Sequence, residues 1–272
     1  MSNDHSDHLR ACKTETLGQL IHHGWYTQTL EHDVQRGRIS QSFKVSRVSP
    51  ATLDALLEDG WRHFGPQFFR QLFDIVGRRL RQITPLRIPI QQSVLTRDQR
   101  RALKKNIDCE SIIRTVVLEK EHYNLFEQHI EKFTENRPTS LENFIGLQSS
   151  AHPCPYMMCE IRLNGTLIAT SFFDVGLESL SSIYAMYDTR LSRRSLGTLT
   201  LLKELEFAQK IGKRFLYTGY AHIGDSYYDY KKRFIGTEIY DWQGNWRPYA
   251  QLNEIEFPQH HFLHQDIPEE LL

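Results

Sequence analysis

Residues 193 to 198 have the residue types of an anion-binding turn. Two arginines precede a short Ser-Leu-Gly-Thr segment, and an apolar run with helical spacing follows at once. Backbone N–H groups at the start of a helix bind phosphate, and guanidinium groups pair with it in a bidentate manner. We expect these residues to hold the anionic part of a substrate: Arg193, Arg194, Ser195, Leu196, Gly197 and Thr198. The alternative is an ordinary capped start of a helix.

Polar and aromatic residues on both sides of this turn are candidates for contact with a substrate. Asp188 ends the preceding strand and can orient a substrate ammonium group, although an acid in that place is also a common turn former. Tyr217 and Tyr220 flank the pair Thr218-Gly219 on the next strand, so one tyrosine should face a cleft while the other packs. The candidates for catalysis are Asp188, Tyr220 and Tyr230, and those for substrate binding are Tyr187, Tyr217, Gly219, Lys231 and Arg233.

Positive charge is concentrated before these motifs. The segment from Arg70 to Lys105 holds ten cations and two acids, whereas the last twenty residues hold five acids and neither Lys nor Arg. Such segregation favours a polyanionic partner on one face, because phosphate binding depends on local charge. The alternative is a solvated helix face. The cations expected to contact the partner lie on one predicted helix: Arg97, Arg100, Arg101, Lys104 and Lys105.

Local signals predict the elements that position these residues. Ser49 and Pro50 begin a helix that ends before Gly60, and Thr96 with Gln99 forms a capping box for the basic helix. A further helix is expected at about 121–136, with Tyr123, Phe126, Ile130 and Phe133 in the core, and another at 196–211. Strand hairpins are expected at 164–165 and 243–244, a third strand at 180–188, a buried strand at 213–222 and a short helix at 226–234.

The order of these elements predicts the fold. Three strands, an anion-type loop, a long helix and a further strand follow one another, which describes the acetyltransferase-like (GNAT) core. We therefore expect an α+β protein with a mixed sheet flanked by helices and a smaller N-terminal α/β subdomain. The expected boundaries are an N-terminal subdomain with the basic helix at 1–115, a GNAT-like catalytic domain at 116–250 and an acidic tail at 251–272.

The anion loop departs from the coenzyme A pattern of GNAT acetyltransferases. That pattern is Gln/Arg-x-x-Gly-x-Gly/Ala, and here Leu199 stands where the last small residue belongs. An acyl-CoA-dependent N-acetyltransferase is therefore an alternative function. The bulkier end of the loop favours another anion.

Three longer stretches carry a resemblance to a known family. They are "PLRIPI…LTRDQRRALKKNID", "YAMYDTRLSRRSLGTLTLLKELEFAQKIGKRFLYTGY" and "YDYKKRF". Between Ser49 and Pro248 the chain resembles the aminoacyl-tRNA–protein transferases, the group of arginyltransferases and bacterial aspartate/glutamate leucyltransferases. The resemblance implies an aminoacyltransferase that moves arginine or leucine from tRNA to an α-amine, most simply a protein or peptide N-terminus in an N-degron pathway. It also implies that the basic helix contacts tRNA.

The N-terminal part departs from the family. Only Tyr26 remains of the first family motif, and Gly77, Leu80 and Ile83 stand where we place the later cysteines of the iron–sulfur or zinc site. We therefore expect a divergent member without a metal or other cofactor, for which aminoacyl-tRNA is the co-substrate. The lost motifs belong to the part of the family that recognises the acceptor. An alternative acceptor is therefore a small molecule, or a second aminoacyl-tRNA, which would give a cyclic dipeptide.

Composition and cysteine use bound the remaining classes. The 272 residues are 40% hydrophobic and 24% charged, and no apolar run approaches the roughly 20 residues that cross a bilayer. The four scattered cysteines, Cys12, Cys109, Cys154 and Cys159, favour reduced thiols over disulfides or a metal site. Five N-terminal histidines match no zinc template. We expect a cytoplasmic protein without a membrane partner.

Overall fold

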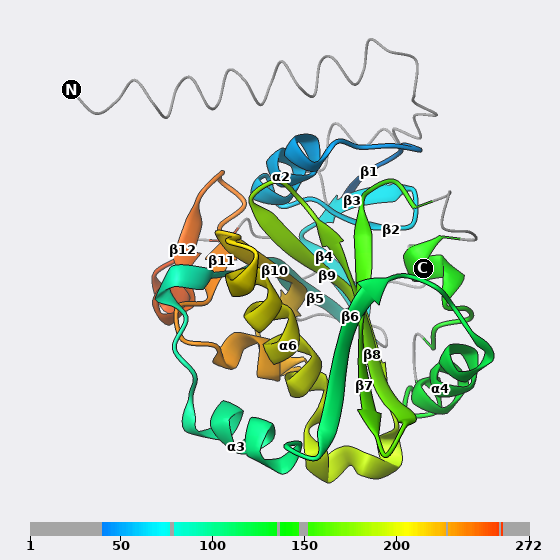
Figure 1. The fold of residues 1–272 in the computed structure, drawn as a ribbon. Coiled ribbons are helices and arrows are strands. Elements are labelled where there is room, and N and C mark those ends of the chain that lie inside the picture. Colours follow the sequence, from blue (N-terminus) through cyan, green and yellow to red (C-terminus); the bar gives the residue numbers. More distant parts are fainter. Residues whose placement is uncertain are drawn as a thin grey trace.

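Two β-sheets form the framework of the computed structural model (Figure 1), which describes residues 40–76, 79–134, 137–146, 152–226, 228–255 and 257. The smaller sheet is antiparallel, with the order β1 (Ser40–Lys44), β3 (Gln67–Gln71), β2 (Arg62–Phe64). The larger sheet has the order β12-β11-β5-β10-β9-β8-β7-β6, and β4 (Phe73–Val76) pairs with β5 beside this path. Its other strands are β5 (Arg79–Pro89), β6 (Cys109–Thr115), β7 (Tyr156–Leu163), β8 (Thr166–Val175), β9 (Ser179–Tyr187), β10 (Phe215–His222), β11 (Glu238–Tyr240) and β12 (Trp246–Pro248).

Helices cover both faces of the larger sheet (Figure 1). They are α2 (Pro50–Glu58), α3 (Arg97–Lys105), α4 (Lys120–Ile130), α5 (Glu142–Ile145) and α6 (Leu196–Lys210), with 3-10 turns η1 (Ile90–Gln92), η3 (Thr189–Arg194), η4 (Asp229–Arg233) and η5 (Tyr249–Glu254). Side chains of a strand alternate between faces. Cys159 and Ile161 of β7 accordingly join the core under α6, while Met158 joins the core under α4.

The larger sheet has the predicted GNAT-like arrangement. Strands β7, β8 and β9 form an antiparallel meander through the turn at Asn164-Gly165, and α6 then leads to β10. Strand β10 pairs with β9 in parallel, the one parallel pair among the described strands. The predicted α+β class with a mixed sheet flanked by helices is therefore confirmed.

The expected boundary at residue 115 runs through this sheet. Strand β5 precedes the boundary in sequence but lies between β10 and β11, and β6 pairs with β7. Residues 1–39, which include Tyr26 and the five N-terminal histidines, lie outside the described residues, as do residue 256 and residues 258–272 of the acidic tail.

Helix predictions are confirmed where caps define them. Ser49 accepts a hydrogen bond from the Thr52 N–H, and Thr96 and Gln99 form both bonds of the capping box. The helix expected at 121–136 is shorter, since α4 ends at Ile130. Tyr123 was predicted in its core but is 38% exposed, whereas Leu125 takes the buried place on that turn. The short helix expected at 226–234 is the 3-10 turn η4.

Candidate active site

The two central strands of the larger sheet separate and leave an opening. Parallel pairing of β9 and β10 extends only from Phe215 opposite Ser179 to Tyr217 opposite Ser181. Beyond this point β9 continues to pair with β8, and β10 pairs with β5. A register shift between Tyr217 and Gly219 accompanies the separation, and Gly219 has a φ of 96°, which favours glycine.

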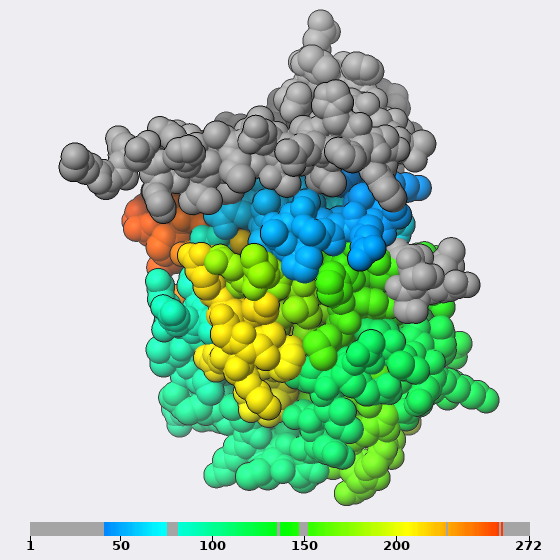
Figure 2. Space-filling view, turned by 45° about the horizontal axis from the view of Figure 1, so that its top comes forward, coloured from blue at the N-terminus to red at the C-terminus, as the bar shows by residue number. Residues whose placement is uncertain are grey.

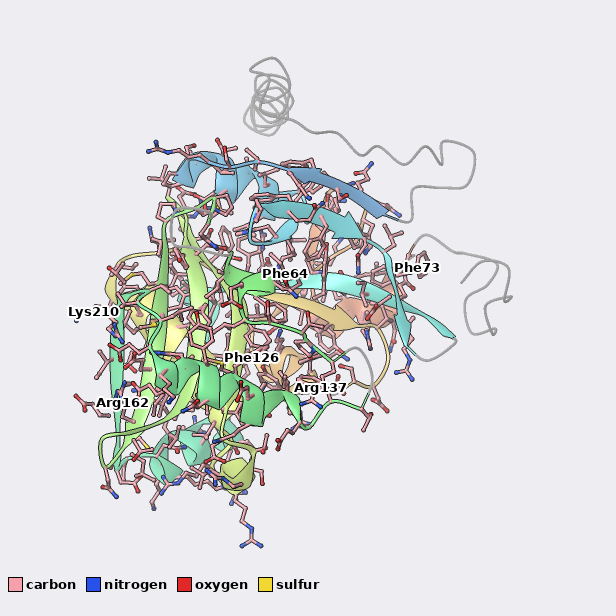
Figure 3. The ribbon with its side chains drawn as sticks, turned by 90° about the vertical axis from the view of Figure 1, so that its right-hand side faces the viewer. Phe64, Phe73, Phe126, Arg137, Arg162 and Lys210 are labelled. Carbon is pink, nitrogen blue, oxygen red and sulfur yellow. The ribbon has the colours of Figure 1, made fainter. Side chains whose placement is uncertain are left out.

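A pocket of about 350 Å³ occupies this opening. Its walls come from β9, β10, the start of α6, the small sheet and the end of α4. The side view in Figure 3 shows Phe64 of β2 and Phe126 of α4 on the same side of the sheet, where Phe64 packs against the core under α4. Aromatic and apolar side chains therefore make up much of the wall, as in most small-molecule sites.

Cations converge on the point where the strands separate. Arg62 of β2 is 5% exposed and donates to Ser181 Oγ at 3.0 Å and to the carbonyl oxygen of Ser182. A Cβ atom added at Gly219 would lie 3.2 Å from Lys231 Nζ and 3.4 Å from Arg62 Nη2. Both cations therefore flank Gly219, and the missing side chain at that position gives them room.

Burial shifts the pKa values of the ionisable side chains around this point toward neutral pH. Burial, together with Arg62, lowers the pKa of Lys231 to about 8, while Glu204 opposes the shift. Burial alone lowers the pKa of Lys132 to about 8, and Lys132 Nζ donates to the Tyr187 hydroxyl at 3.2 Å. Burial also raises the pKa of Glu204 on α6 to about 7. Perturbed groups of this kind gather at functional sites more often than elsewhere.

Six of the residues predicted from the sequence line this pocket: Tyr187, Gly197, Gly219, Tyr220, Tyr230 and Lys231. Gly197 lets the Tyr187 ring approach α6, because a Cβ atom there would lie 3.3 Å from the ring. Of the two tyrosines on β10, Tyr220 is the one that faces the cleft. Its hydroxyl donates to the Gly60 carbonyl oxygen at 3.0 Å, and burial raises its pKa. A hydroxyl group that donates this hydrogen bond is better placed to shape the pocket wall than to accept a proton.

The structure places the other predicted residues outside the pocket lining. Asp188 accepts two hydrogen bonds from the Arg190 guanidinium, which lowers the pKa of its carboxyl. Tyr217 packs near Trp246, with its hydroxyl 3.2 Å from Glu58 Oε2. Leu196 lies in the core under α6. The remaining residues of this group are Arg193, Arg194, Ser195, Thr198 and Arg233.

The anion turn is tied to α3. Arg194 donates to both carboxylate oxygens of Asp108, at 2.8 and 2.9 Å, and Lys105 Nζ donates to the Arg193 carbonyl oxygen. The N–H groups of Thr198 and Leu199 donate to the Ser195 carbonyl oxygen, so the helix itself uses two donors of the turn. The turn therefore joins α6 to the basic helix, and the cations that line the pocket come from other elements.

The basic helix presents its cations to solvent as predicted. Arg97, Arg100, Arg101, Lys104 and Lys105 are all exposed, while Gln99 and Ala102 face inward. In the space-filling view (Figure 2) the yellow-green segment near residue 190 lies beside the green surface formed around α3. These cations and the exposed Arg190 and Arg193 form one basic surface outside the pocket, which we call the basic face.

Sequence reasoning missed several polar groups at the site, among them three that line the pocket and one behind it. Arg62, His129 and Lys132 line the pocket, and Glu204 lies behind it, 3.5 Å from Ser182 Oγ. Glu204 carried a signal, because an acid on the inward side of the predicted helix 196–211 is unusual. The other three carried none, since their place depends on how β2 and α4 pack against the sheet.

Comparison with known proteins decides the family. A profile described as the C terminus of arginine-tRNA-protein transferase matches residues 121–241. An aspartate/glutamate leucyltransferase from Acinetobacter baylyi is 30% identical over 208 residues, which cover 75% of this chain and 74% of that protein. The chain belongs to the arginine-tRNA-protein transferase family. A second member of the family, the aspartate/glutamate leucyltransferase from Helicobacter hepaticus, is 27% identical over 207 residues, 74% of this chain and 84% of that protein.

Membership of the arginine-tRNA-protein transferase family makes this protein an aminoacyltransferase. Similar solved structures include L-PGS from Bacillus licheniformis, with a TM-score of 0.40 and 9% identity over 65% of this chain and 52% of that chain. A GCN5-related N-acetyltransferase from Kribbella flavida has a TM-score of 0.37 and 14% identity, covering 69% and 59%. Within the described residues, no helix is long and apolar enough to span a membrane.

Proposed function

We propose that the enzyme transfers an amino acid from an aminoacyl-tRNA to the N-terminal α-amine of a protein or peptide, as in N-degron pathways. The observation that carries the proposal is the pocket between β9 and β10, where cations converge on a backbone that Gly219 leaves open. Both substrates occur in the cytoplasm, so we place the enzyme there. The transfer step needs no cofactor besides aminoacyl-tRNA.

The charge of the pocket supports an acidic acceptor. Three cations, Arg62, Lys132 and Lys231, line it together with the single acid Asp74. A carboxylate at the first residue of the acceptor would be attracted to these cations, and its free α-amine would then lie in the opening. The relatives are named aspartate/glutamate leucyltransferases, which agrees with an acceptor that begins with Asp or Glu.

The same charges support an apolar aminoacyl group on the donor. A cationic arginyl side chain would be repelled by Arg62, Lys132 and Lys231. A leucyl side chain fits the aromatic and aliphatic wall formed by Phe64, Phe144, Ile183 and Leu201, among others. We therefore propose leucyl transfer over arginyl transfer.

The chemistry requires mainly alignment. The acceptor amine attacks the ester carbonyl of the aminoacyl-tRNA, the new amide C–N bond forms, and the ester C–O bond breaks. The amine loses one proton and the released ribose hydroxyl gains one, so the step balances. An N-terminal amine has an ordinary pKa near 8, so a fraction is neutral at pH 7 and positioning supplies much of the rate. Tyr230 and the start of α6 at Gly197 lie where the ester can be held, and Asp188 remains a proposed orienting residue.

The experiment that tests the function supplies a mixture of labelled aminoacyl-tRNAs with peptides that differ only in their first residue. Mass spectrometry then identifies the product. The expected result is a peptide beginning with Asp or Glu that has gained one leucine. Acetylation with acetyl-CoA in the absence of tRNA, or a cyclic dipeptide formed without any peptide, would contradict the proposal.

The acceptor preference should depend on pH. Lys132 and Lys231 are cationic below pH about 8 and neutral above it, so their attraction for an acceptor carboxylate is lost as the pH rises. We expect the ratio of kcat/KM for an Asp-peptide to that for the matching Asn-peptide to fall above pH about 8. The ratio cancels the ionisation of the acceptor amine, which both peptides share. A ratio that stays constant across this range would rule out recognition by these lysines.

The basic face should bind tRNA without reading its sequence. The double variant Arg100→Glu/Arg101→Glu should bind tRNA about tenfold or more weakly at low salt, and the difference should shrink as salt rises. Arg214→Glu is the control, because Arg214 is an exposed arginine paired with Glu178 away from α3. Filter binding over a salt series measures both variants. Equal losses in the two variants would show that only total charge matters.

A further inference from the structure

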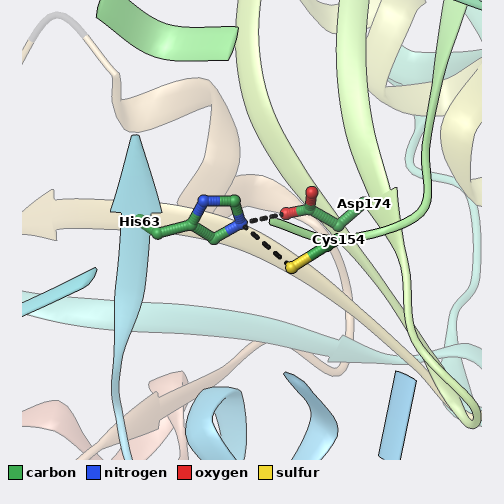
Figure 4. A group of neighbouring side chains, drawn as sticks. All are labelled: His63, Cys154 and Asp174. Atoms are coloured by element: carbon green, nitrogen blue, oxygen red, sulfur yellow. Dashed lines mark hydrogen bonds and ion pairs between the residues drawn. The ribbon is translucent and has the colours of Figure 1, made fainter. Parts of the chain in front are cut away.

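Four polar side chains meet in the buried region between the two sheets. His63 comes from β2, His152 and Cys154 precede β7, and Asp174 lies near the end of β8. His63 Nε2 lies 2.8 Å from Asp174 Oδ2, and His152 Nε2 lies 2.7 Å from Asp174 Oδ1. Figure 4 shows the sulfur of Cys154 and the carboxylate of Asp174 on the same ring nitrogen of His63, with Sγ at 3.8 Å.

Two neutral histidines have too few N–H groups for the acceptors that surround them in this cluster. Each histidine has an acceptor at both ring nitrogens, because His63 Nδ1 faces the Gly65 carbonyl oxygen at 2.8 Å and His152 Nδ1 faces that of Ile145 at 3.1 Å. A neutral imidazole has one N–H group, so it cannot satisfy both neighbours. Two imidazolium ions would satisfy them, but they would leave a net positive charge beside one carboxylate in the interior, which is costly.

A bound divalent cation resolves the conflict. With Nδ1–H donating to a backbone carbonyl, Nε2 carries a lone pair toward the carboxylate and the thiol, the arrangement common for metal-bound histidine. His63, Cys154 and Asp174 place their donor atoms within 4.8 Å of one another. The Nε2–Sγ distance of 3.8 Å is close to the roughly 3.6 Å edge of a tetrahedral zinc site. The ion would replace the hydrogen bond between His63 and Asp174.

A surface hollow lies next to the cluster. His152 and Cys154 also line this hollow, which is bounded by residues 46–50 and by Pro153 and Pro155. It is separate from the transfer pocket, whose lining includes none of the four residues.

We propose that the enzyme binds a zinc-type divalent cation through His63 Nε2, Cys154 Sγ and Asp174. His152 contacts the other carboxylate oxygen of Asp174 and orients this ligand. The thiolate and the carboxylate would balance the charge of the ion. Imidazole and thiolate together favour zinc over calcium or magnesium. The ion would link the small sheet to β7 and β8, so its role is structural and independent of the proposed transfer. This site differs from the cysteine cluster that the sequence lacks.

The test measures metal content and cobalt spectra of the full-length protein, purified without chelator or metal-affinity resin. Wild type should hold about one equivalent of zinc, and cobalt substitution should give a thiolate-to-cobalt charge-transfer band. Cys154→Ala should lose the band and most of the metal. Cys159→Ala should keep both, because Cys159 is an equally buried thiol outside the cluster.

Two outcomes would overturn the proposal. One is wild type without stoichiometric metal even after incubation with zinc or cobalt. The other is metal that binds equally well to wild type and to Cys154→Ala, which would assign it to other ligands such as the N-terminal histidines. If Cys154→Ala fails to fold, the triple variant Cys12→Ala/Cys109→Ala/Cys159→Ala decides. A thiolate-to-cobalt band in that variant can come only from Cys154, and its absence would overturn the proposal.

Discussion

The Arg62→Met variant should lose aminoacyl transfer by a factor of about 100 to 1,000 in kcat/KM. Arg62 fixes the point where β9 and β10 separate, through Ser181 and Ser182, and its charge acts to lower the pKa of the buried Glu204. Methionine keeps much of the apolar volume but leaves Glu204 without this positive neighbour. A loss of 100- to 1,000-fold corresponds to about 2.7–4.1 kcal/mol, within the roughly 2–5 kcal/mol that removing a buried, hydrogen-bonded charge costs. Single-turnover transfer to an acidic peptide measures the effect.

Arg70→Met is the matched control for this variant. Arg70 lies on β3 of the same small sheet and pairs with Asp59, but it does not line the pocket. Its transfer rate should stay within about twofold of wild type, since an ion pair near the surface contributes little. Thermal unfolding of both variants shows whether a loss of activity comes from the site or from a destabilised fold. Similar transfer rates for the two variants would show that Arg62 does not contribute to the active site.

Asp174→Asn should be the most destabilising single polar substitution in the described part of the chain. The carboxylate is buried, contacts two histidines and is an anionic ligand of the proposed ion, whereas asparagine is neutral and has only one side-chain oxygen. Breaking a buried charged contact typically costs 3–5 kcal/mol, so we expect a loss of about 3 kcal/mol in the free energy of unfolding. Urea denaturation at pH 7 measures it.

The pH dependence of stability identifies the cause. Burial raises the pKa of Asp174, but His63 and His152 lower it by more, so the net shift is downward. Its contribution to stability is therefore present above the unfolded pKa of about 3.9 and is lost as the pH falls below that value. The acid-induced loss should be smaller in Asp174→Asn. In Asp108→Asn, where the acid is half exposed beside Arg194, stability should hardly change.

Local signals made much of the fold predictable. The caps at Ser49 and Thr96 and the turn at Asn164-Gly165 act between residues a few positions apart, so the sequence alone contains the interaction. The end of α4 was mispredicted because the apolar spacing continues to Phe133 although the helix stops at Ile130. Periodicity reports which residues can be buried, and the neighbouring sheet decides where the helix ends.

The candidate site was predictable only in part. Four residues of the site lie on the consecutive elements α6, β10 and η4: Gly197, Gly219, Tyr220 and Lys231. Their order along the chain therefore indicates that they are close in space. Arg62 enters from a different sheet, 119 residues from its partner Ser181. Arg194 shows the opposite case. Its charge suggests that it binds a substrate anion, whereas in the folded chain it pairs with Asp108.

The position of β5 has a consequence for how the chain is made. This strand leaves the ribosome long before β10 and β11, since Arg87 of β5 bonds to Glu238 of β11 across 151 residues. During synthesis β4 can pair with the start of β5, but the rest of β5 waits for β10 and β11, and pairings this distant in sequence form slowly. Residues 121–241, although they match a family profile, would expose the inner edges of β10 and β11 if expressed alone. We therefore expect that the residues matching the family profile do not fold by themselves.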